Sequence, residues 1–301
     1  MSIPNQNVDL PILKEKGVTL HIKREDTIHP FISGNKYRKL KYNLIEAKKL
    51  GYGTLLTFGG AFSNHIAAAA YAGNTSGIKT IGVVRGEELA EQWQENPTLQ
   101  LAKEHGMHFH FVSRSTYRKK NTIGFLNDLK ESFGECYILP EGGTNELAVK
   151  GCEEILTSED AQFDIVSCCV GTGGTLAGLI NSAQSHQTVL GFPALKGDFL
   201  KEDILKFVQN ENWNLISDYH FGGYAKVDER LIEFINAFKK ETEIPLDPIY
   251  TGKMLFGILD MIKKGVFEQG TRILAIHTGG LQGIEGMNLV LKKKNLPLLD
   301  L

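Results

Sequence analysis

The 301-residue sequence has few cysteines and almost no net charge. Its four cysteines, Cys136, Cys152, Cys168 and Cys169, form no C-x-x-C pair and lack the spacing of a disulfide framework. The 33 Lys and Arg residues against 35 Asp and Glu give a net charge of −2, whereas nucleic-acid binding needs a basic face. These shortages argue against a disulfide-stabilised scaffold and against a nucleic-acid partner.

Long apolar runs and leader patterns are missing as well. No stretch approaches the roughly 20 apolar residues that span a bilayer. Residues 1–17 contain no basic segment followed by an apolar one. His105, His108 and His110 resemble a metal-binding group, but no carboxylate or cysteine completes the ligand set. We therefore expect a cytoplasmic protein without a metal ion and without a membrane partner.

Glycine, by contrast, is abundant. The chain has 32 glycines, which exceeds the average usage of about 7%. Its hydrophobic fraction of 42% is ordinary, so a loosely packed chain does not explain them. The glycines therefore indicate backbone positions that adopt a positive φ or lie close to another group.

Short apolar runs alternate with longer amphipathic stretches along the chain. Strands are predicted at residues 19–23, 54–58, 80–84, 108–112, 136–139, 164–170, 188–192 and 272–276. Helices are predicted at residues 37–50, 66–73, 97–106, 146–156, 175–185, 228–240 and 253–264. This alternation predicts an α/β fold with parallel sheets flanked by helices. Because no linker rich in Pro or Ser divides the chain, one domain inserted within another is favoured over two consecutive domains.

Lys36 lies in the first turn of a predicted helix, within the polar segment 33–40. The positive end of the helix dipole disfavours a cation there, and so favours the deprotonated amine that a Schiff-base lysine requires. The alternative is a surface lysine in a basic run, which is the commoner case for an isolated Gly-Asn-Lys.

Two glycine turns each connect a predicted strand to a predicted helix. Turn 57–65 carries Ser63, Asn64 and His65, which either cap the helix or contact a ligand. Turn 170–178 offers backbone N–H groups that can hold an anion. Its glycine spacing matches neither a Walker loop nor a dinucleotide-binding fingerprint, so a monophosphate fits it better.

A third glycine turn and two tyrosines complete the set of candidates. Turn 277–283 carries Thr278, whose hydroxyl either contacts a ring atom or caps the following helix. Tyr224 and Tyr250 each lie beside a glycine or a predicted helix start, although an isolated tyrosine is more often a packed residue.

Together these segments resemble a known enzyme family. Gly-Asn-Lys, Ser-Asn-His, Gly-Thr-Gly-Gly-Thr, Asp-Pro-x-Tyr-Thr-Gly-Lys and His-Thr-Gly-Gly occur in this order between Leu20 and Gly283. The set is similar to pyridoxal-phosphate (PLP) enzymes of fold type II, within them to the 1-aminocyclopropane-1-carboxylate (ACC) deaminase and D-cysteine desulfhydrase family. The resemblance implies a two-domain, three-layer fold of the tryptophan synthase β-subunit type. It also implies a large PLP-binding domain of residues 1–46 and 146–301, an inserted α/β domain of residues 47–145, and a homodimer.

The same resemblance implies roles for individual residues. Lys36 would form the Schiff base with the cofactor and then act as the base for the α-proton. Asn64 would bind the 3′-oxygen of the cofactor, and Thr278 its pyridine nitrogen. The phosphate would be held by Gly171, Thr172, Gly173, Gly174 and Thr175 together with Lys39. The small amino-acid substrate would contact Ser63, Asn64, His65, Tyr224 and Tyr250, of which Ser63, Tyr224 and Tyr250 would join Lys36 as catalytic residues.

Two threonines favour one activity within the family. The ACC deaminase pattern has Tyr-Glu-Gly-Lys and His-Leu-Gly-Gly, whereas this chain has threonine at both variable places, Thr251 and Thr278, as in the desulfhydrase pattern. We therefore expect β-elimination from D-cysteine to pyruvate, ammonia and hydrogen sulfide. ACC deamination to 2-oxobutyrate and ammonia is the alternative, and a PLP-binding protein without turnover is a third. Phe62 replaces a common family glutamine, and we expect it to alter the carboxylate site.

Overall fold

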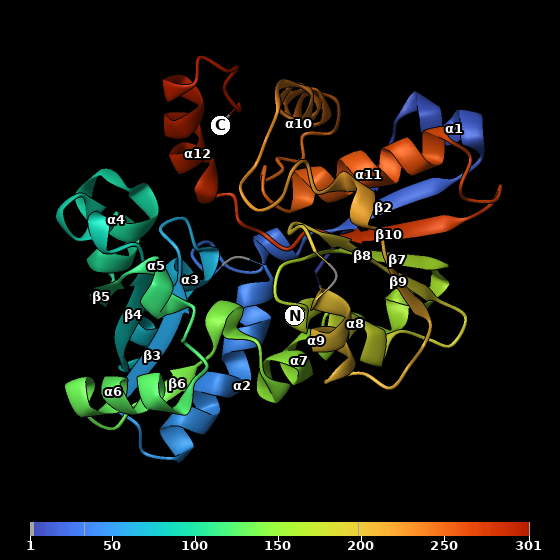
Figure 1. Cartoon of the computed structure of the whole chain (residues 1–301). Helices are drawn as coiled ribbons and strands as arrows, with labels where there is room; N and C mark the ends of the chain where they lie inside the picture. The colour runs from blue at the N-terminus through green and yellow to red at the C-terminus, as the bar shows by residue number, and fades with distance from the viewer. Residues whose placement is uncertain (1–2, 33, 198, 301) are drawn as a thin grey trace.

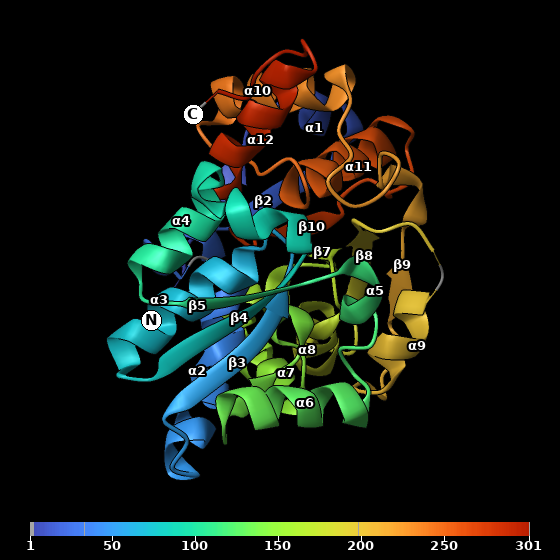
Figure 2. The same cartoon turned by 60° about the vertical axis from the view of Figure 1, so that its left-hand side comes forward.

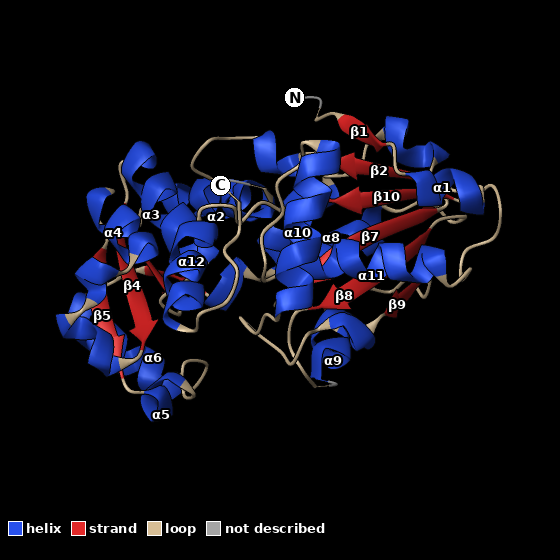
Figure 3. Cartoon of the chain, turned by 90° about the horizontal axis from the view of Figure 1, so that it is seen from above, coloured by secondary structure: helices blue, strands red, loops and turns tan. Residues whose placement is uncertain are grey.

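The computed structural model describes residues 3–32, 34–197 and 199–300. In this part of the chain the strands form two separate sheets, and helices cover both faces of each (Figures 1 and 3). The predicted α/β fold with parallel sheets flanked by helices is therefore confirmed.

The first sheet has the strand order β1-β2-β10-β7-β8-β9 and is built from two distant parts of the chain. Its strands are β1 (Asn5–Val8), β2 (Thr19–Lys23), β7 (Ile165–Val170), β8 (Thr188–Pro193), β9 (Trp213–Leu215) and β10 (Arg272–Ile276). β1 pairs antiparallel with β2, and the other pairings are parallel. Along β10, Ile273 and Leu274 enter the cores on opposite faces, so the strand is apolar on both sides.

The second sheet has four parallel strands in the order β5-β4-β3-β6. They are β3 (Thr54–Gly59), β4 (Lys79–Arg85), β5 (His108–Val112) and β6 (Tyr137–Leu139). Leu55 and Leu56 are consecutive on β3 and are both fully buried, in cores on opposite faces. This sheet is therefore also covered on both sides.

Helices complete a layered arrangement around each sheet (Figure 2). The helices are α1 (Pro11–Lys16), α2 (Asn35–Lys49), α3 (Asn64–Ser76), α4 (Pro97–Glu104), α5 (Arg114–Tyr117), α6 (Ile123–Phe133), α7 (Glu146–Glu153), α8 (Gly174–Ser182), α9 (Phe199–Leu205), α10 (Glu229–Thr242), α11 (Thr251–Lys263) and α12 (Gly283–Lys293). On the first sheet, α10, α11 and α12 cover one face, and α7, α8 and α9 cover the other. No helix of the described residues has the length and apolarity needed to cross a membrane.

All eight predicted strands and all seven predicted helices occur, with bounds that shift by a few residues. The hydrophobic pattern gave no ranges for β1, β9, α1, α5, α6, α9 and α12, although the glycine turn 277–283 predicted a helix where α12 begins. β1 and β9 are edge strands of four and three residues, too short for an alternating pattern to stand out. α6 follows Thr122, a common cap residue that makes no cap hydrogen bond here, whereas α12 follows Gln282 and lacks the usual start signal of a helix.

The division of the chain into domains at residues 46 and 146 stays a prediction. It is supported by the strands of the second sheet, which all fall between Thr54 and Leu139. α2 packs on both units: its Ala47 shares the core of the second sheet, while its Arg38 lies against α7 of the first.

Candidate active site

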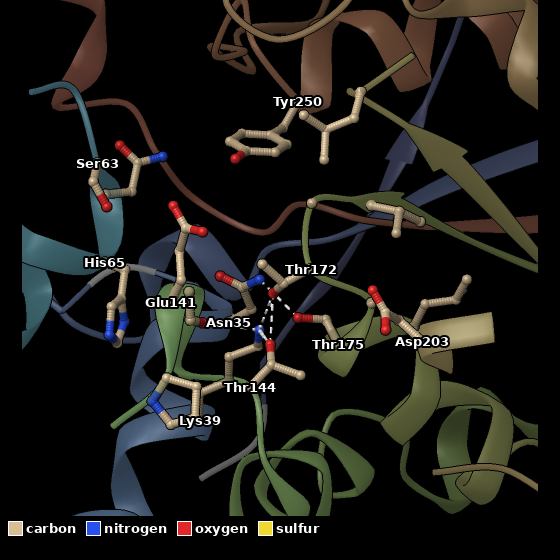
Figure 4. Close-up of a pocket in the computed structure, with 18 of the residues that line it drawn as sticks. Asn35, Lys39, Ser63, His65, Glu141, Thr144, Thr172, Thr175, Asp203 and Tyr250 are labelled. Atoms are coloured by element: carbon tan, nitrogen blue, oxygen red, sulfur yellow. Dashed lines mark hydrogen bonds between the residues drawn. The ribbon is translucent and has the colours of Figure 1, made fainter. Parts of the chain in front are cut away.

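A cavity of about 800 Å³ lies where the carboxyl ends of strands from both sheets meet. Its walls include the ends of β3, β4, β7 and β10 and the first turn of α2 (Figure 4). The predicted site residues that line it are Lys36, Lys39, Ser63, Asn64, His65, Gly171, Thr172, Gly173, Thr175, Tyr224, Tyr250 and Thr278. Gly174 lies just behind the wall, since a Cβ on it would be 3.3 Å from Lys39 Nζ. The fold thus brings all these residues together, whereas their roles stay predictions.

Lys36 reaches the cavity because the chain before it makes an unusually close approach. Gly34 precedes α2 with a φ of +62°, and a Cβ there would lie only 2.0 Å from the backbone oxygen of Thr278. Only glycine allows this contact. The amide of Asn35 then donates to the same oxygen over 3.3 Å, which fixes the start of α2 against the end of β10.

The amine of Lys36 donates to a neutral amide rather than to a carboxylate. Its Nζ donates to Asn35 Oδ1 over 2.9 Å, and Asn35 Nδ2 donates in turn to Thr175 Oγ1 over 2.8 Å. Burial lowers the pKa of Lys36, and the negative potential of Cys169 and, more weakly, of Asp247 opposes that effect only in part. The deprotonated, nucleophilic amine is therefore favoured, as the sequence predicted from the helix dipole.

An anion cradle lies between β7 and α8. Gly173 caps α8 with a φ of +84°, and the first N–H groups of a helix have no acceptor within the helix. Lys39 Nζ completes the cradle, with Thr144 Oγ1 at 2.9 Å and Thr172 Oγ1 at 3.4 Å (Figure 4). Burial, and then the charge of Lys36, lower the pKa of Lys39 to about 7. A bound dianion would restore the charge on Lys39.

The side chains around the predicted ring position are also held in place. Thr278, at the end of β10, has its Oγ1 atom 3.0 Å from Cys169 Sγ. Asn64 accepts a hydrogen bond at Oδ1 from Gln282 Nε2 over 2.8 Å, which leaves its Nδ2 group as a donor. Both side chains are therefore oriented before a ligand arrives.

His65 is a neutral, buried imidazole. Thr57 Oγ1 donates to the backbone oxygen of Leu139, so it must accept the hydrogen of His65 Nε2, which lies 2.8 Å away. His65 Nδ1 is then an acceptor, and it has no partner among the described residues. Burial, followed by the charges of Lys36 and Lys39, holds the pKa of His65 well below its usual value.

Tyr224 and Tyr250 pack together on the opposite wall. Their ring centroids lie 6.2 Å apart with an interplanar angle of 64°. Burial raises the pKa of both phenols, which therefore stay protonated near neutral pH. Ser63, on the facing loop, caps α3 by accepting from the amide of Ile66 over 3.3 Å.

Two buried charges hold the tyrosines, and the sequence reasoning gave them no role. The Asp247 carboxylate accepts from the amides of Tyr250 at 2.9 Å and Thr251 at 2.8 Å, and so organises the start of α11. Lys253 Nζ donates to the backbone oxygens of His220 at 3.0 Å and Gly223 at 2.8 Å, just before Tyr224. An Asp-Pro pair a few residues before the predicted helix 253–264 was the available signal for the first of them.

Several cavity residues were missed altogether. They are Arg85, Lys120, Asn121, Glu141, Asp203 and Lys206. Arg85 ends β4 and Glu141 follows β6, so the general rule that ligands bind at the carboxyl ends of parallel strands would have found these two. The Glu141 carboxylate accepts from the Tyr117 hydroxyl at 2.7 Å and pairs with Lys120 at 3.3 Å.

Phe62 points away from this cavity. Its ring lies against Gly286 of α12, where an added Cβ would be 3.0 Å from two ring carbons, and it lines a separate small groove. Its ring does not line the cavity, so any effect on the carboxylate site would be indirect and stays a prediction. Ser63 lines the cavity, whereas Phe62, its neighbour in the chain, lines the separate groove.

The arrangement fits pyridoxal phosphate. A lysine with a lowered pKa lies at one end, and a glycine turn with a buried lysine forms a phosphate cradle in the same cavity. Asn64 and Thr278 offer neutral polar groups suited to the oxygen and nitrogen of a pyridine ring. Lys36, Lys39, Asn64, Thr278 and residues 171–175 would hold the cofactor.

Comparison with known proteins agrees with this fit. Residues 3–279 match the family described as "Pyridoxal-phosphate dependent enzyme". The mitochondrial bifunctional D-cysteine desulfhydrase/ACC deaminase of Arabidopsis thaliana is 31% identical, over 89% of this chain and 74% of its own length. The ACC deaminase of Pseudomonas syringae is 26% identical, over 91% of this chain and 90% of its own length.

A solved structure agrees over an even larger part of the chain. An ACC deaminase homologue superimposes with a TM-score of 0.80 and 29% identity, covering 97% of this chain and 94% of that one. Sequence and fold thus both match PLP-dependent enzymes over nearly the whole chain, and the residues of the cavity fit the same cofactor. The chain belongs to the family of pyridoxal-phosphate-dependent enzymes.

Proposed function

We propose that this enzyme catalyses β-elimination from D-cysteine, giving pyruvate, ammonia and hydrogen sulfide. The observation that carries the proposal is the neutral Thr278 hydroxyl, 3.0 Å from the Cys169 thiol at the predicted ring-nitrogen position. A hydroxyl does not stabilise a fully protonated pyridine ring as a carboxylate does, which suits elimination at the β-carbon. The name of the Arabidopsis relative includes this activity, together with ACC deamination.

The residues around the cavity divide the chemical work. When bound, pyridoxal phosphate supplies an electron sink for the pair released at the α-carbon. The Lys36 amine, whose pKa is lowered by burial, takes the α-proton. Tyr250 donates a proton to the departing sulfur as the Cβ–S bond breaks, with Tyr224 packed beside it. Water then releases ammonia from the remaining skeleton, which leaves pyruvate.

Ser63, Asn64 and His65 form the substrate-facing loop in this proposal. Ser63 offers its hydroxyl to the amino acid, and the Nδ2 group of Asn64 binds the ring oxygen of the cofactor. His65 stays neutral and presents an acceptor at Nδ1. Lys39 and residues 171–175 hold the phosphate.

ACC deamination to 2-oxobutyrate and ammonia is the second candidate. The name of the Pseudomonas syringae relative favours it. At the position where the deaminase pattern has glutamate, Thr251 is fully buried and its Oγ1 donates to Asp247 Oδ1 over 2.7 Å. That hydroxyl offers no acidic group for ring opening, so D-cysteine is the preferred substrate.

A substrate panel tests the proposal. The PLP-loaded enzyme is incubated with D-cysteine, L-cysteine, D-serine and ACC, and hydrogen sulfide, pyruvate, 2-oxobutyrate and ammonia are measured. We expect hydrogen sulfide and pyruvate from D-cysteine, and no product with the Lys36→Ala variant. Production of 2-oxobutyrate from ACC alone would favour the second candidate. Cofactor binding without any product would indicate a PLP-binding protein without turnover.

Location and assembly are proposed from the sequence. We retain a cytoplasmic location and a homodimer as proposals, the first from cysteines without the spacing of a disulfide framework and the second from the family resemblance. Sedimentation velocity of the PLP-loaded protein tests the dimer directly.

A further inference from the structure

We propose that Arg85 forms a binding site for the α-carboxylate of the amino-acid substrate, beside the Ser63 loop. The inference depends on the proposed function only in requiring an amino acid as the ligand. In this proposal the Arg85 guanidinium is the cation that distinguishes an amino acid from a simple amine in this cavity.

Arg85 lies at the carboxyl end of β4 and lines the cavity. Its Nη2 atom is 3.4 Å from the point where a Cβ on Gly60 would lie. The backbone oxygen of Gly60 accepts from the amide of Ser63 over 3.1 Å, so the guanidinium lies over the turn that carries Ser63. The cation and the Ser63 hydroxyl therefore flank one part of the cavity.

The other cations of the cavity wall already have oxygen acceptors. Lys36 donates to Asn35, Lys39 to Thr144, Lys120 pairs with Glu141 and Lys206 with Asp203. For Arg85 no acceptor occurs among the residues that the structure describes, and its guanidinium lies instead 5.7 Å from the ring centroid of Tyr117. The flat donor edge of an arginine matches a carboxylate in a two-point hydrogen bond.

The position of Arg85 favours a carboxylate over the cofactor phosphate. The phosphate cradle lies on the first sheet and has its own cation, Lys39. Arg85 belongs to the second sheet, close enough to the tyrosines that its charge opposes the rise in the pKa of Tyr224. The nearby Glu141 carboxylate is held by Tyr117 and Lys120 and does not compete for the guanidinium.

The test compares an amino acid with the amine that lacks its carboxylate. The PLP-loaded wild type, Arg85→Gln and Arg85→Lys are titrated with D-alanine and with ethylamine, and the absorbance of the bound cofactor is followed. Neither compound has a leaving group at the β-carbon, so the titration reports binding even if D-cysteine is not the substrate. Arg114→Gln is the matched control, since that exposed arginine pairs with Glu88 outside the cavity.

We expect Arg85→Gln to raise the apparent dissociation constant for D-alanine about 10- to 100-fold, as for a lost charged hydrogen bond, and to leave that for ethylamine unchanged. Arg85→Lys retains the charge and should lose less affinity for D-alanine. Arg114→Gln should bind both ligands as the wild type does. Equal weakening of both ligands by Arg85→Gln would overturn the proposal, and so would unchanged binding of D-alanine. Circular dichroism checks that each variant is folded.

Discussion

At the scale of single residues, the two lysines of α2 show how neighbours in one helix acquire different chemistry. Lys36 is partly buried beside Asn35, and Lys39 is almost fully buried among the hydroxyls of Thr144 and Thr172. Both have lowered pKa values, because burial penalises the charged amine. Lys36 is then suited to act as a nucleophile and base, and Lys39 as an anion receptor that takes up a proton when its ligand binds.

The pKa of Lys39 predicts a pH dependence for cofactor binding. In the free enzyme the pKa is about 7, and a bound phosphate raises it, so binding is accompanied by proton uptake above pH 7. Affinity for 4-deoxypyridoxine phosphate, which has the phosphate but no aldehyde, should therefore fall as the pH rises from about 7 to about 9. Calorimetry in buffers of different ionisation enthalpy measures the proton uptake. Lys39→Met should abolish it; uptake that persists in this variant would contradict the assignment.

The lowered pKa of Lys39 also makes the free energy of unfolding depend on pH. An unfolded lysine keeps the ordinary pKa of 10.5, so between about pH 7 and that value the unfolded chain binds more protons at Lys39 than the folded one. Lys39 therefore makes the cofactor-free protein more stable as the pH rises through this window.

At the scale of elements, the first turn of α11 positions the tyrosine wall. Asp247 has a side chain that is 1% exposed, and its carboxylate accepts from the amides of Ile249, Tyr250 and Thr251. The amides of Tyr250 and Thr251, at the start of α11, have no acceptor inside the helix. The carboxylate thus stabilises the start of α11 and at the same time fixes the backbone of Tyr250.

Replacing Asp247 should therefore affect both stability and turnover. Asp247→Ala should lower the free energy of unfolding by roughly 2 kcal/mol or more, because several buried N–H donors lose an acceptor. Urea denaturation measures the loss, and the rate of pyruvate release should fall with it. Asp247→Asn keeps one acceptor oxygen, so its free energy of unfolding should lie between those of the wild type and Asp247→Ala. An alanine variant as stable as the wild type would show that the cap is dispensable.

At the scale of the whole molecule, the cavity depends on how two sheets meet. Catalytic candidates come from the strand ends of both sheets, so a change in their relative position would alter the site. Phe62 and Gln282 connect the two: the Phe62 ring lies on α12, and Gln282 binds Asn64. These contacts hold the Ser63 loop against the C-terminal part of the chain.

Removing the Phe62 ring should loosen that connection. Phe62→Ala is expected to raise KM for the amino acid several-fold with little change in cofactor affinity, and to lower the free energy of unfolding by roughly 1–2 kcal/mol because the ring is only half-buried. Steady-state kinetics, spectral titration with PLP and urea denaturation measure the three quantities. Phe62→Leu keeps an apolar contact and serves as the control. Weakened cofactor binding at unchanged KM would contradict this role.

The sequence by itself determined the local features of this protein. Strand-turn-helix segments, the helix start at Lys36 and the anion cradle at 171–175 depend on residues close together in the chain, and the structure has all of them. The order of the motifs was enough to indicate the family, because each motif is short and carries its own backbone requirement.

Only the tertiary structure decided which distant groups meet. Cys169 and Thr278 are neighbours because β7 and β10 pair, Phe62 packs outward because α12 returns to the second sheet, and Arg85 reaches the cavity because β4 ends beside the Ser63 loop. The first two contacts have no signal in local sequence, and for Arg85 the only signal is its place at the end of a strand, since each contact depends on strand order and on the packing of segments far apart in the chain. The physical reason is that strand pairing and burial join residues far apart in the chain, whereas turns and helix caps depend on residues a few positions apart.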